Sequence, residues 1–366
     1  MPVELGNLQA RSILLNGNEL VGSLDAAFCP KSPAQELIVD CLEDELECSC
    51  CTTCCTRDDI NCTTTTESGP IGSTLAPEIA NSRILKLRAI LEPISGTKSL
   101  SDPTSDHYKV LQWMAQSDPN PQDIDNTDPI YIVQKYVLIL LFVSLNGNNW
   151  KDNIGWLGET SFCSWDGISC DSGDLVEAID LGGRYCVGGL ATEIGALNTT
   201  IKILNLGNNP ELSGTVPTEL AALTALASLD LSYCQFTGSL PLEISRLSHL
   251  EELHVDNNLL VGSISPEIAS LSRLKRLSMG HNDFTGTIPS ELGDMEELIV
   301  LEFNDNSFTS TIPTQLGSLG NLNSLDLSYN ELIGAIPFEL GGMTLLENLY
   351  LSKFVVRAIF IQKLLA

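Results

Sequence analysis

Apolar residues recur along the chain with a period of 24 residues from Val176 to Ser352. The pattern is LxxLxLxxNxLxGxIPxxLxxLxx, and a clear copy, LKRLSMGHNDFTGTIPSELGDMEE, begins at Leu274. The period is longer by one residue where Pro210 or Glu211 is inserted. A recurrence of this length is typical of a solenoid, in which each copy forms one coil. Copies begin at Val176, Ile201, Leu226, Leu250, Leu274, Leu298, Leu322 and Leu346, the last of them shortened.

Each copy predicts a short strand whose apolar side chains point inward from LxxLxL, and stacked copies predict a parallel sheet. One copy buries about seven apolar side chains at roughly 1.5–3 kcal/mol each. Ordering its backbone costs about 1–2 kcal/mol per residue, so no copy folds without neighbours. An asparagine after the strand can satisfy backbone groups of adjacent coils. This residue is Asn209, Asn258, Asn282, Asn306 or Asn330 in five copies, and Arg184 or Cys234 in two others.

Glycine and proline define the second half of each copy. Glycine permits a tight turn and proline fixes an extended path. Ser265 and Ser310 depart from this pattern without altering the period. The combined motif resembles the plant-type leucine-rich repeat of receptor-like kinases, receptor-like proteins and secreted inhibitors. The resemblance implies an α/β solenoid, a right-handed superhelix with a concave parallel β-sheet. The motif residues are Gly214, Gly238, Gly286 and Gly334 with Pro217, Pro241, Pro289, Pro313 and Pro337.

The segment before the array predicts helices. Asp128-Pro129 is a helix start, and the apolar run that follows is too short to span a bilayer. Further helices are expected from about Ser105 to Gln116, and near residues 81–93, where Ile84, Leu87 and Leu91 have helical spacing. Trp150, Trp156 and CSWDGISC resemble the amino-terminal cap of plant-type arrays. That resemblance implies a disulfide between Cys163 and Cys170 and tryptophans that cover the first coil. Cys186 and Cys234 are expected to be buried free thiols.

The first residues also match a repeat, because PVELGNLQARSILLNGNELVGSL carries the end of one coil and the start of another. The cysteine-rich stretch that follows resembles a carboxy-terminal cap. Dense cysteines in a short segment favour disulfides and an oxidising compartment, although CxC and CxxC spacings leave zinc as a rival. Asn61 and Asn198 fit the N-glycosylation pattern. The cysteines of unassigned pairing are Cys29, Cys41, Cys48, Cys50, Cys51, Cys54, Cys55 and Cys62.

The order of these parts suggests an internal piece of a longer tandem protein, or a gene model that joins two neighbours. We interpret residues 1–62 as the end of one array, 63–80 as a Thr-rich linker and 81–175 as a helical cap. Residues 176–352 are a second array, and 353–366 are a tail that matches no repeat. A signal peptide is not visible and would have been lost upstream. Uncovered array ends would favour self-association.

The composition and the motifs that are missing reduce the number of possible functions. Asp and Glu outnumber Lys and Arg by 47 to 19, a formal charge of −28, which disfavours nucleic acid and anionic membranes. Kinase motifs are missing, and the histidines lack metal-ligand spacing. We therefore expect no enzyme activity, no cofactor and no membrane span in this chain.

The residues between the apolar positions of LxxLxLxx are expected on the concave face, as either a ligand surface or a solvated sheet. The leading hypothesis is an extracellular or cell-surface module that binds a protein, peptide or glycan. The alternatives are the ectodomain of a receptor-like kinase and a structural wall or matrix protein. Candidate ligand residues are Asp230, Tyr233, His254, Asp256, Arg276, His281, Glu302, Asp305, Asp326 and Tyr329.

Overall fold

The computed structural model describes residues 12–14, 36–38, 77–197 and 200–353. These residues belong to two compact units: residues 63–237 make one, and residues 1–62 with 238–366 make the other. Both units contain stacked coils joined by parallel strands, so the expected solenoid is confirmed. The eight cysteines between Cys29 and Cys62, Asn61, Asn198 and the tail from residue 354 lie outside the described residues.

Three helices open the unit of residues 63–237, and they are α2 (Pro77–Ser99), α3 (Asp106–Gln116) and α4 (Pro129–Ser144). The sequence sets where two of them begin. Ser105 caps α3 by accepting a hydrogen bond from the Tyr108 N–H, and Asp128 caps α4 by accepting one from Ile130 at 2.9 Å. The helices expected from apolar spacing are therefore confirmed, and α2 also runs beyond residue 93 to Ser99.

Helix α4 covers the edge of the first coil and satisfies its backbone groups. The Gln134 Oε1 accepts a hydrogen bond from the Val176 N–H at 2.8 Å, and Gln134 Nε2 donates to Thr200 Oγ1 at 2.9 Å. Thr200 Oγ1 in turn donates to the Val176 carbonyl at 2.7 Å. A buried ion pair, Lys135 Nζ to Asp118 at 2.6 Å, ties α4 to the chain after α3. The helical cap therefore satisfies the backbone of Val176 with side chains that are themselves hydrogen-bonded.

An aromatic cluster fills the space between α4 and the first coil. Trp150 and Trp156 stand edge to face with ring centroids 5.0 Å apart, and Trp156 lies 4.9 Å from Trp165. Both η2 (Gly147–Asn149) and η3 (Phe162–Ser164) are 3-10 helices in this region. Strand β3 (Ile168–Cys170) pairs antiparallel with β4 (Val176–Asp180), a pairing that the repeat pattern did not predict.

Each coil from β4 to β16 contributes one strand to each of two sheets, and a 3-10 helix follows the second strand. In the unit of residues 63–237 the first sheet runs β3-β4-β6-β8 and the second runs β5-β7-β9. The bounds are β6 (Ile203–Asn205), β8 (Ser228–Asp230), β5 (Val187–Gly189), β7 (Glu211–Thr215), β9 (Gln235–Gly238), η4 (Thr192–Leu197) and η5 (Thr218–Ala222).

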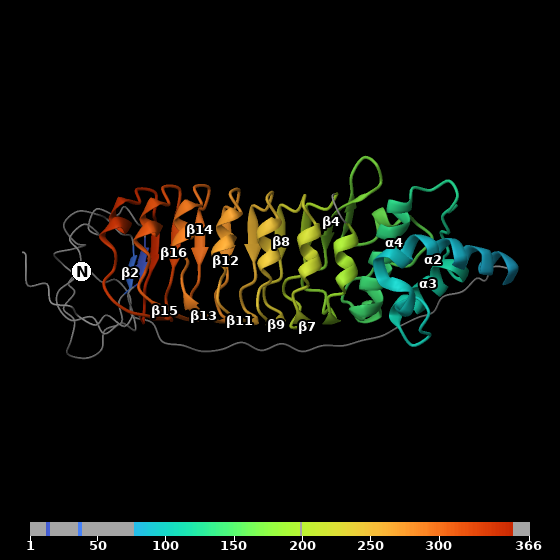
Figure 1. Ribbon diagram of the computed structural model, residues 1–366, viewed down its shortest axis with the longest axis horizontal. Coiled ribbons are helices and arrows are strands. Elements are labelled where there is room, and N and C mark those ends of the chain that lie inside the picture. The colour runs from blue at the N-terminus through green and yellow to red at the C-terminus, as the bar shows by residue number, and fades with distance from the viewer. Residues whose placement is uncertain (1–11, 15–35, 39–76, 198–199, 354–366) are drawn as a thin grey trace, which may run out of the picture. The chain divides into compact units, whose positions relative to one another are not determined.

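The other unit repeats this architecture from residue 238 to residue 353. Figure 1 shows β12, β14 and β16 side by side along one side of the coils, with β11, β13 and β15 along the other. The first-sheet strands are β10 (Glu252–His254), β12 (Arg276–Ser278), β14 (Val300–Glu302), β16 (Ser324–Asp326) and β18 (Asn348–Tyr350). The second-sheet strands are β11 (Leu259–Gly262), β13 (Asp283–Thr287), β15 (Ser307–Ser310) and β17 (Glu331–Leu332). The 3-10 helices are η6 (Leu242–Arg246), η7 (Pro266–Ser270), η8 (Ser290–Asp294), η9 (Thr314–Ser318) and η10 (Phe338–Gly342).

The expected register of the apolar positions is confirmed. Leu253 pairs with Leu277, and the same position continues through Leu301, Leu325 and Leu349. All five of these leucines are at most 1% exposed. Two further strands, β1 (Ser12–Leu14) and β2 (Glu36–Ile38), add to this sheet beyond β18. The expectation of an uncovered edge at β18 is therefore corrected, because β1 pairs with it.

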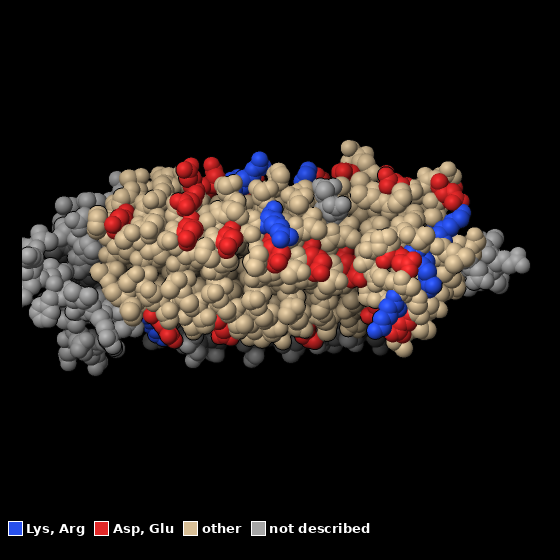
Figure 2. All heavy atoms as spheres, in the orientation of Figure 1, with Lys and Arg blue, Asp and Glu red and all other residues tan. Residues whose placement is uncertain are grey.

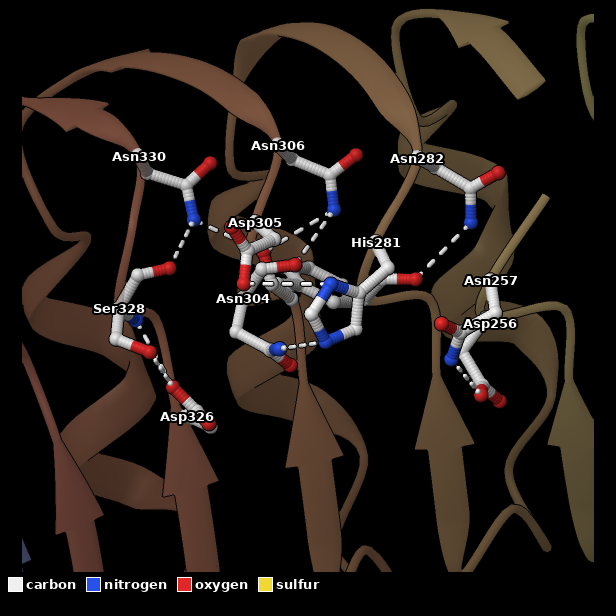
Figure 3. Close-up of polar contacts among 12 residues, drawn as sticks. Asp256, Asn257, His281, Asn282, Asn304, Asp305, Asn306, Asp326, Ser328 and Asn330 are labelled. Atoms are coloured by element: carbon white, nitrogen blue, oxygen red, sulfur yellow. Dashed lines mark hydrogen bonds and ion pairs between the residues drawn. The ribbon is translucent and has the colours of Figure 1, made fainter. Parts of the chain in front are cut away.

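The asparagines after the strands form the expected ladder, which Figure 3 shows for Asn282, Asn306 and Asn330. Asn282 Nδ2 donates to the Val255 carbonyl of the previous coil at 2.9 Å, and its Oδ1 accepts from the Leu260 N–H at 2.9 Å. Asn330 bridges to Phe303 and Phe308 in the same way. Each amide thus forms hydrogen bonds to backbone groups of neighbouring coils in the interior. An unpaired backbone group there would lower the stability of the fold.

Candidate functional site

The strand face of the unit that begins at residue 238 presents side chains in rows. We use "strand face" for the outward side chains of β10, β12, β14, β16 and β18 and of the residues that follow each strand. Because the coils are in register, one row runs His254, Ser278, Glu302, Asp326 and Tyr350. Adjacent strands lie about 4.8 Å apart, so neighbours in a row can contact one another.

Glu302 and Asp305 gather polar partners from the coil before them. Ser278 Oγ donates to a Glu302 carboxylate oxygen at 2.6 Å, and His281 Nδ1 lies 3.3 Å from Asp305 Oδ2. Asn304 Nδ2 lies 3.2 Å from His281 Nε2, so the imidazole is held between an amide and a carboxylate (Figure 3). The row of Asn282, Asn306 and Asn330 lies above this cluster in Figure 3 and fixes the coil backbones that carry it.

Asp326 is the most strongly perturbed carboxyl group among the described residues. Its pKa is raised from 3.8 to about 6, chiefly by burial and to a smaller extent by the nearby charges of Glu302 and Asp305. Hydrogen bonds from the Ser328 N–H at 2.9 Å and the Ser328 hydroxyl act in the opposite direction. The group therefore changes its charge close to neutral pH. Sequence alone gave no sign of this, because Asp230-Leu-Ser-Tyr233 carries the same local motif.

In each coil from β10 to β18, the residue three places after the end of the first-sheet strand has a left-handed backbone. Asn257, His281, Asp305, Tyr329 and Lys353 all have φ between 51° and 55°. Non-glycine residues pay about 1–2 kcal/mol for this conformation, so the coil geometry imposes it repeatedly. It also turns these side chains outward: Tyr329 lies under the Lys353 ammonium, 4.6 Å from the ring centroid.

The structure brings together some of the expected ligand residues and separates others. His281, Glu302, Asp305, Asp326 and Tyr329 lie on three successive coils. His254 and Asp256 lie on the coil before them, whereas Arg276 lies on the same coil as His281 and is in register with Glu252. Asp230 and Tyr233 belong to the unit of residues 63–237, where Asp230 accepts two hydrogen bonds from Ser232. The sequence analysis missed Ser278, Asn304 and Lys353, although their place in the repeat marks them as outward positions.

The second sheet offers a different surface. Its exposed positions carry small hydroxyl and aliphatic side chains, and an open groove of about 590 Å³ lies beside it. Ser310 lines this groove with a φ of +73°, where the equivalent residues are glycines with positive φ. Asp283 and Glu331 are exposed charged residues of this sheet. The exposed hydroxyl and aliphatic residues include Val261, Ser263, Thr285, Thr287, Thr309, Thr311 and Ile333.

Comparison with known proteins identifies the array. A family described as a leucine-rich repeat region matches residues 192–364. The array is a leucine-rich-repeat region of the plant type. Receptor-like protein 7 from Arabidopsis thaliana is 36% identical over 84 residues, which are 22% of this chain and 8% of that protein.

Solved structures with the same repeat support this assignment. The crystal structure of PEPR1-AtPEP1 has 30% identity and a TM-score of 0.55, covering 61% of this chain and 32% of that one. A plant ice-binding protein has 28% identity and a TM-score of 0.57, covering 61% and 71%. The Arabidopsis receptor kinase HAESA, in complex with the peptide hormone IDA and the co-receptor SERK1, has 26% identity and a TM-score of 0.52, covering 61% and 41%. This leucine-rich-repeat chain thus spans about a third of PEPR1 and under a tenth of Receptor-like protein 7.

The cysteines of the leucine-rich-repeat chain behave as expected where the structure describes them. Cys163 and Cys170 form a disulfide with their Cα atoms 5.4 Å apart. Cys186 and Cys234 are free and buried. Burial raises the pKa of the Cys186 thiol to about 12 and that of Cys234 to about 11. Cys234 Sγ also lies 3.4 Å from the Leu206 carbonyl, in the place that asparagine occupies in other coils.

Neither a candidate metal site nor a candidate membrane span is present in the described parts of the chain. Across residues 77–197 and 200–353 no group of three or more His, Cys, Asp or Glu side chains could hold a metal ion. In the same residues, no helix combines the length and the apolar character that crossing a bilayer requires. Figure 2 shows Asp and Glu scattered over the visible face, with fewer Lys and Arg among them.

Proposed function

We propose that the strand face between Asp256 and Lys353 binds an extended peptide, or an extended segment of a protein, that carries a cationic side chain. The observation that carries this proposal is the group of three carboxylates, Glu302, Asp305 and Asp326, on adjacent strands beside Tyr329. An ammonium or guanidinium group placed there would relieve the mutual repulsion of the carboxylates and gain a cation–π contact. The structure of HAESA in complex with the peptide hormone IDA supports a peptide as the class of ligand.

The nearby lysine side chains do not neutralise the carboxylates of Glu302, Asp305 and Asp326. Lys275 Nζ pairs with Glu251 at 2.7 Å, and Lys353 lies over Tyr329, so neither neutralises Glu302 or Asp326. His281 pairs with Asp305, and the strength of that pair depends on protonation of the imidazole. A ligand cation would lower the pKa of Asp326 toward its ordinary value. Binding should therefore release a proton near pH 6 and should tighten as the pH rises through that value.

The test is selection of random linear peptides against the full chain, followed by calorimetry with the enriched peptides. We expect Lys- or Arg-containing peptides, with a binding enthalpy that depends on the buffer at pH 6 because a proton is released. The triple variant Glu302→Gln, Asp305→Asn, Asp326→Asn should bind on the order of tenfold more weakly. Asp283→Asn removes an exposed charge from the second sheet and is the matched control. Enrichment of peptides without cations, or equal weakening by the control, would overturn the proposal.

We also propose an extracellular site of action. The Cys163–Cys170 disulfide closes the cap of the array, and stable disulfides of this kind belong to oxidising compartments. The leucine-rich-repeat ectodomains that resemble this chain support the same location. The measurement is mass mapping of the protein from its native source without reduction. Alkylation of Cys163 in that sample would contradict this location.

Adsorption to ice is a second candidate, and the second sheet favours it. Hydroxyl and aliphatic side chains recur once per coil there, and Thr287 pairs directly with Thr309 across neighbouring strands. Thr309 Oγ1 donates to the Gly286 carbonyl at 3.2 Å, so its rotamer is fixed and its methyl group is held in a repeating position. Apart from Asp283 and Glu331, the exposed side chains of β11, β13, β15 and β17 are uncharged, and a regular, rigid surface suits a crystalline ligand. A plant ice-binding protein with the same repeat supports this candidate.

Inhibition of ice recrystallisation by the purified chain separates the two candidates. We expect Thr309→Lys to abolish any inhibition, because a long charged side chain would disrupt the flat surface. Ser324→Lys, on the half-exposed strand face, is the control and should leave inhibition unchanged. A chain that binds cationic peptides and leaves ice growth untouched would exclude the second candidate and retain the first.

A further inference from the structure

The groove beside the second sheet lies where three successive strands end and three 3-10 helices begin. Its volume is about 590 Å³, and its lining comes from the ends of β11, β13 and β15 and the starts of η7, η8 and η9. Figure 1 shows these three strands next to one another. The floor is apolar, because Ile264 and Ile288 line the groove while only 7% and 3% exposed. Three coils of one unit therefore contribute to a single groove.

The hydroxyl groups inside the groove differ from those on the neighbouring part of the sheet. On β15, outside the groove, Thr309 Oγ1 donates to the Gly286 carbonyl at 3.2 Å. Inside it, the hydroxyl groups of Thr287, Ser310 and Thr311 make no hydrogen bond to another residue that the structure describes. A hydroxyl group can donate one hydrogen bond and accept others. The groove therefore has three exposed groups that can bind a polar ligand.

Glu291 and Gln315 add an acceptor and a donor from the 3-10 helices. Glu291 Oε2 accepts a hydrogen bond from Ser290 Oγ at 3.2 Å, which leaves Oε1 for a ligand. Gln315 Oε1 accepts from Thr314 Oγ1 at 3.3 Å, which leaves the two N–H groups of Nε2. Among the described residues that line the groove, Glu291 is the only charged one. The groove thus offers hydrogen bonds of both kinds with little charge.

Two departures from the repeat pattern meet at this groove. Ser310 stands where the coils on either side have Gly286 and Gly334, and it keeps their positive φ, at +73°. A side chain makes this conformation unfavourable, so glycine would suit the fold better. Ser265, which replaces a proline of the pattern, lies between two residues that line the groove. Strain that persists beside a groove indicates a role in binding.

We propose that this groove binds a neutral polysaccharide chain. A sugar ring carries hydroxyl groups at its edge and C–H groups on its faces, so it matches polar sides over an aliphatic floor. An anionic chain would meet the carboxylate of Glu291 and, among the described lining residues, no cation. A cationic ligand would gain little from one exposed carboxylate. A flat ice face cannot follow a concave groove, whereas a chain can lie along it.

Calorimetric titration of the full chain with soluble polysaccharides tests the class of ligand. We expect binding of xyloglucan or galactomannan, and at least about tenfold weaker binding after the primary hydroxyl groups of the same polymer are oxidised to carboxylates. No binding of either neutral polymer would overturn the proposal, as would equal binding of the oxidised form. The groove belongs to the second sheet, so this result is independent of peptide binding by the strand face.

Ser310→Gly separates binding from folding. The variant should resist urea better than the unaltered chain and yet bind the polysaccharide about three- to tenfold more weakly, because one hydrogen-bonding group is lost. A loss of affinity in a more stable protein cannot come from unfolding. Unchanged affinity in Ser310→Gly would remove this serine from the site.

A pair of lysine substitutions tests the location. Thr311→Lys should weaken binding about tenfold or more, because its side chain would fill the groove. Ser239→Lys is the matched control: Ser239 is exposed, has the same position in the repeat and does not line the groove. Its affinity should change less than about twofold. Equal loss in both variants, or no loss in Thr311→Lys, would place the polysaccharide elsewhere and overturn the proposal.

Discussion

Replacement of Asp326 by asparagine should stabilise the array at neutral pH and leave its stability unchanged at low pH. Asparagine keeps an oxygen that can accept the hydrogen bonds from the Ser328 N–H and hydroxyl. It removes the negative charge that burial, together with Glu302 and Asp305, makes unfavourable. The substitution therefore isolates the electrostatic cost of this site from its hydrogen bonds.

The raised pKa sets the size and the sign of the effect. The folded carboxyl group has a pKa of about 6, against 3.8 for an ordinary aspartate, a difference of about two units. At 1.36 kcal/mol per unit this corresponds to at most about 3 kcal/mol. We expect about 1–2 kcal/mol, because part of the side chain remains in contact with water. The folded state binds the proton more tightly, so the unfavourable contribution is complete above about pH 6 and disappears below about pH 4.

The assay is urea unfolding of the full chain and of Asp326→Asn between pH 4 and pH 7.5. The variant should gain 1–2 kcal/mol in the free energy of unfolding at pH 7.5, with the difference shrinking toward zero at pH 4. Asp230→Asn is the matched control, because Asp230 makes the same contacts with Ser232 while its partner on β6 is the uncharged Asn205. An equal gain in the control, or a loss of stability in Asp326→Asn at both pH values, would refute the reasoning.

Three further predictions concern the coils and the cap. Ser310→Gly should stabilise the chain by about 1 kcal/mol in urea unfolding, because glycine adopts the positive φ of this position without strain; a loss of stability would contradict the assigned backbone. Asn282→Ala should cost about 2–3 kcal/mol, since it leaves buried backbone groups of two coils unpaired, whereas the half-exposed Asn304→Ala should cost less than about 0.5 kcal/mol. In the folded chain at pH 8, Cys186 and Cys234 should resist iodoacetamide until urea is added; rapid labelling of either would show that its thiol is accessible.

The sequence determined the coil and its register, because both depend on residues that lie close together and recur. The spacing of Leu277, Leu301 and Leu325 alone assigned these side chains to one buried stack. The bonds of Asn282 and Asn330 followed from the same repeat, as did the burial of Cys234 in an asparagine position. The start of α4 was also predictable, because it depends only on the adjacent residues Asp128 and Pro129. The second sheet and its 3-10 helices were missed, because each second-sheet strand buries only one apolar position and so shows no periodic pattern of its own.

The tertiary structure decided the properties that arise between coils. Asp230 and Asp326 occupy identical motifs, yet the perturbation of Asp326 includes charges on Glu302 and Asp305, which belong to the preceding coil. The grouping of His281, Asn304 and Asp305 also depends on which side chains adjacent strands bring into contact. The pairing of Ile13 with Leu349 could not be read from the sequence. A repeat pattern specifies the kind of surface that a coil can stack against. Only the folded structure determines which other coil provides that surface.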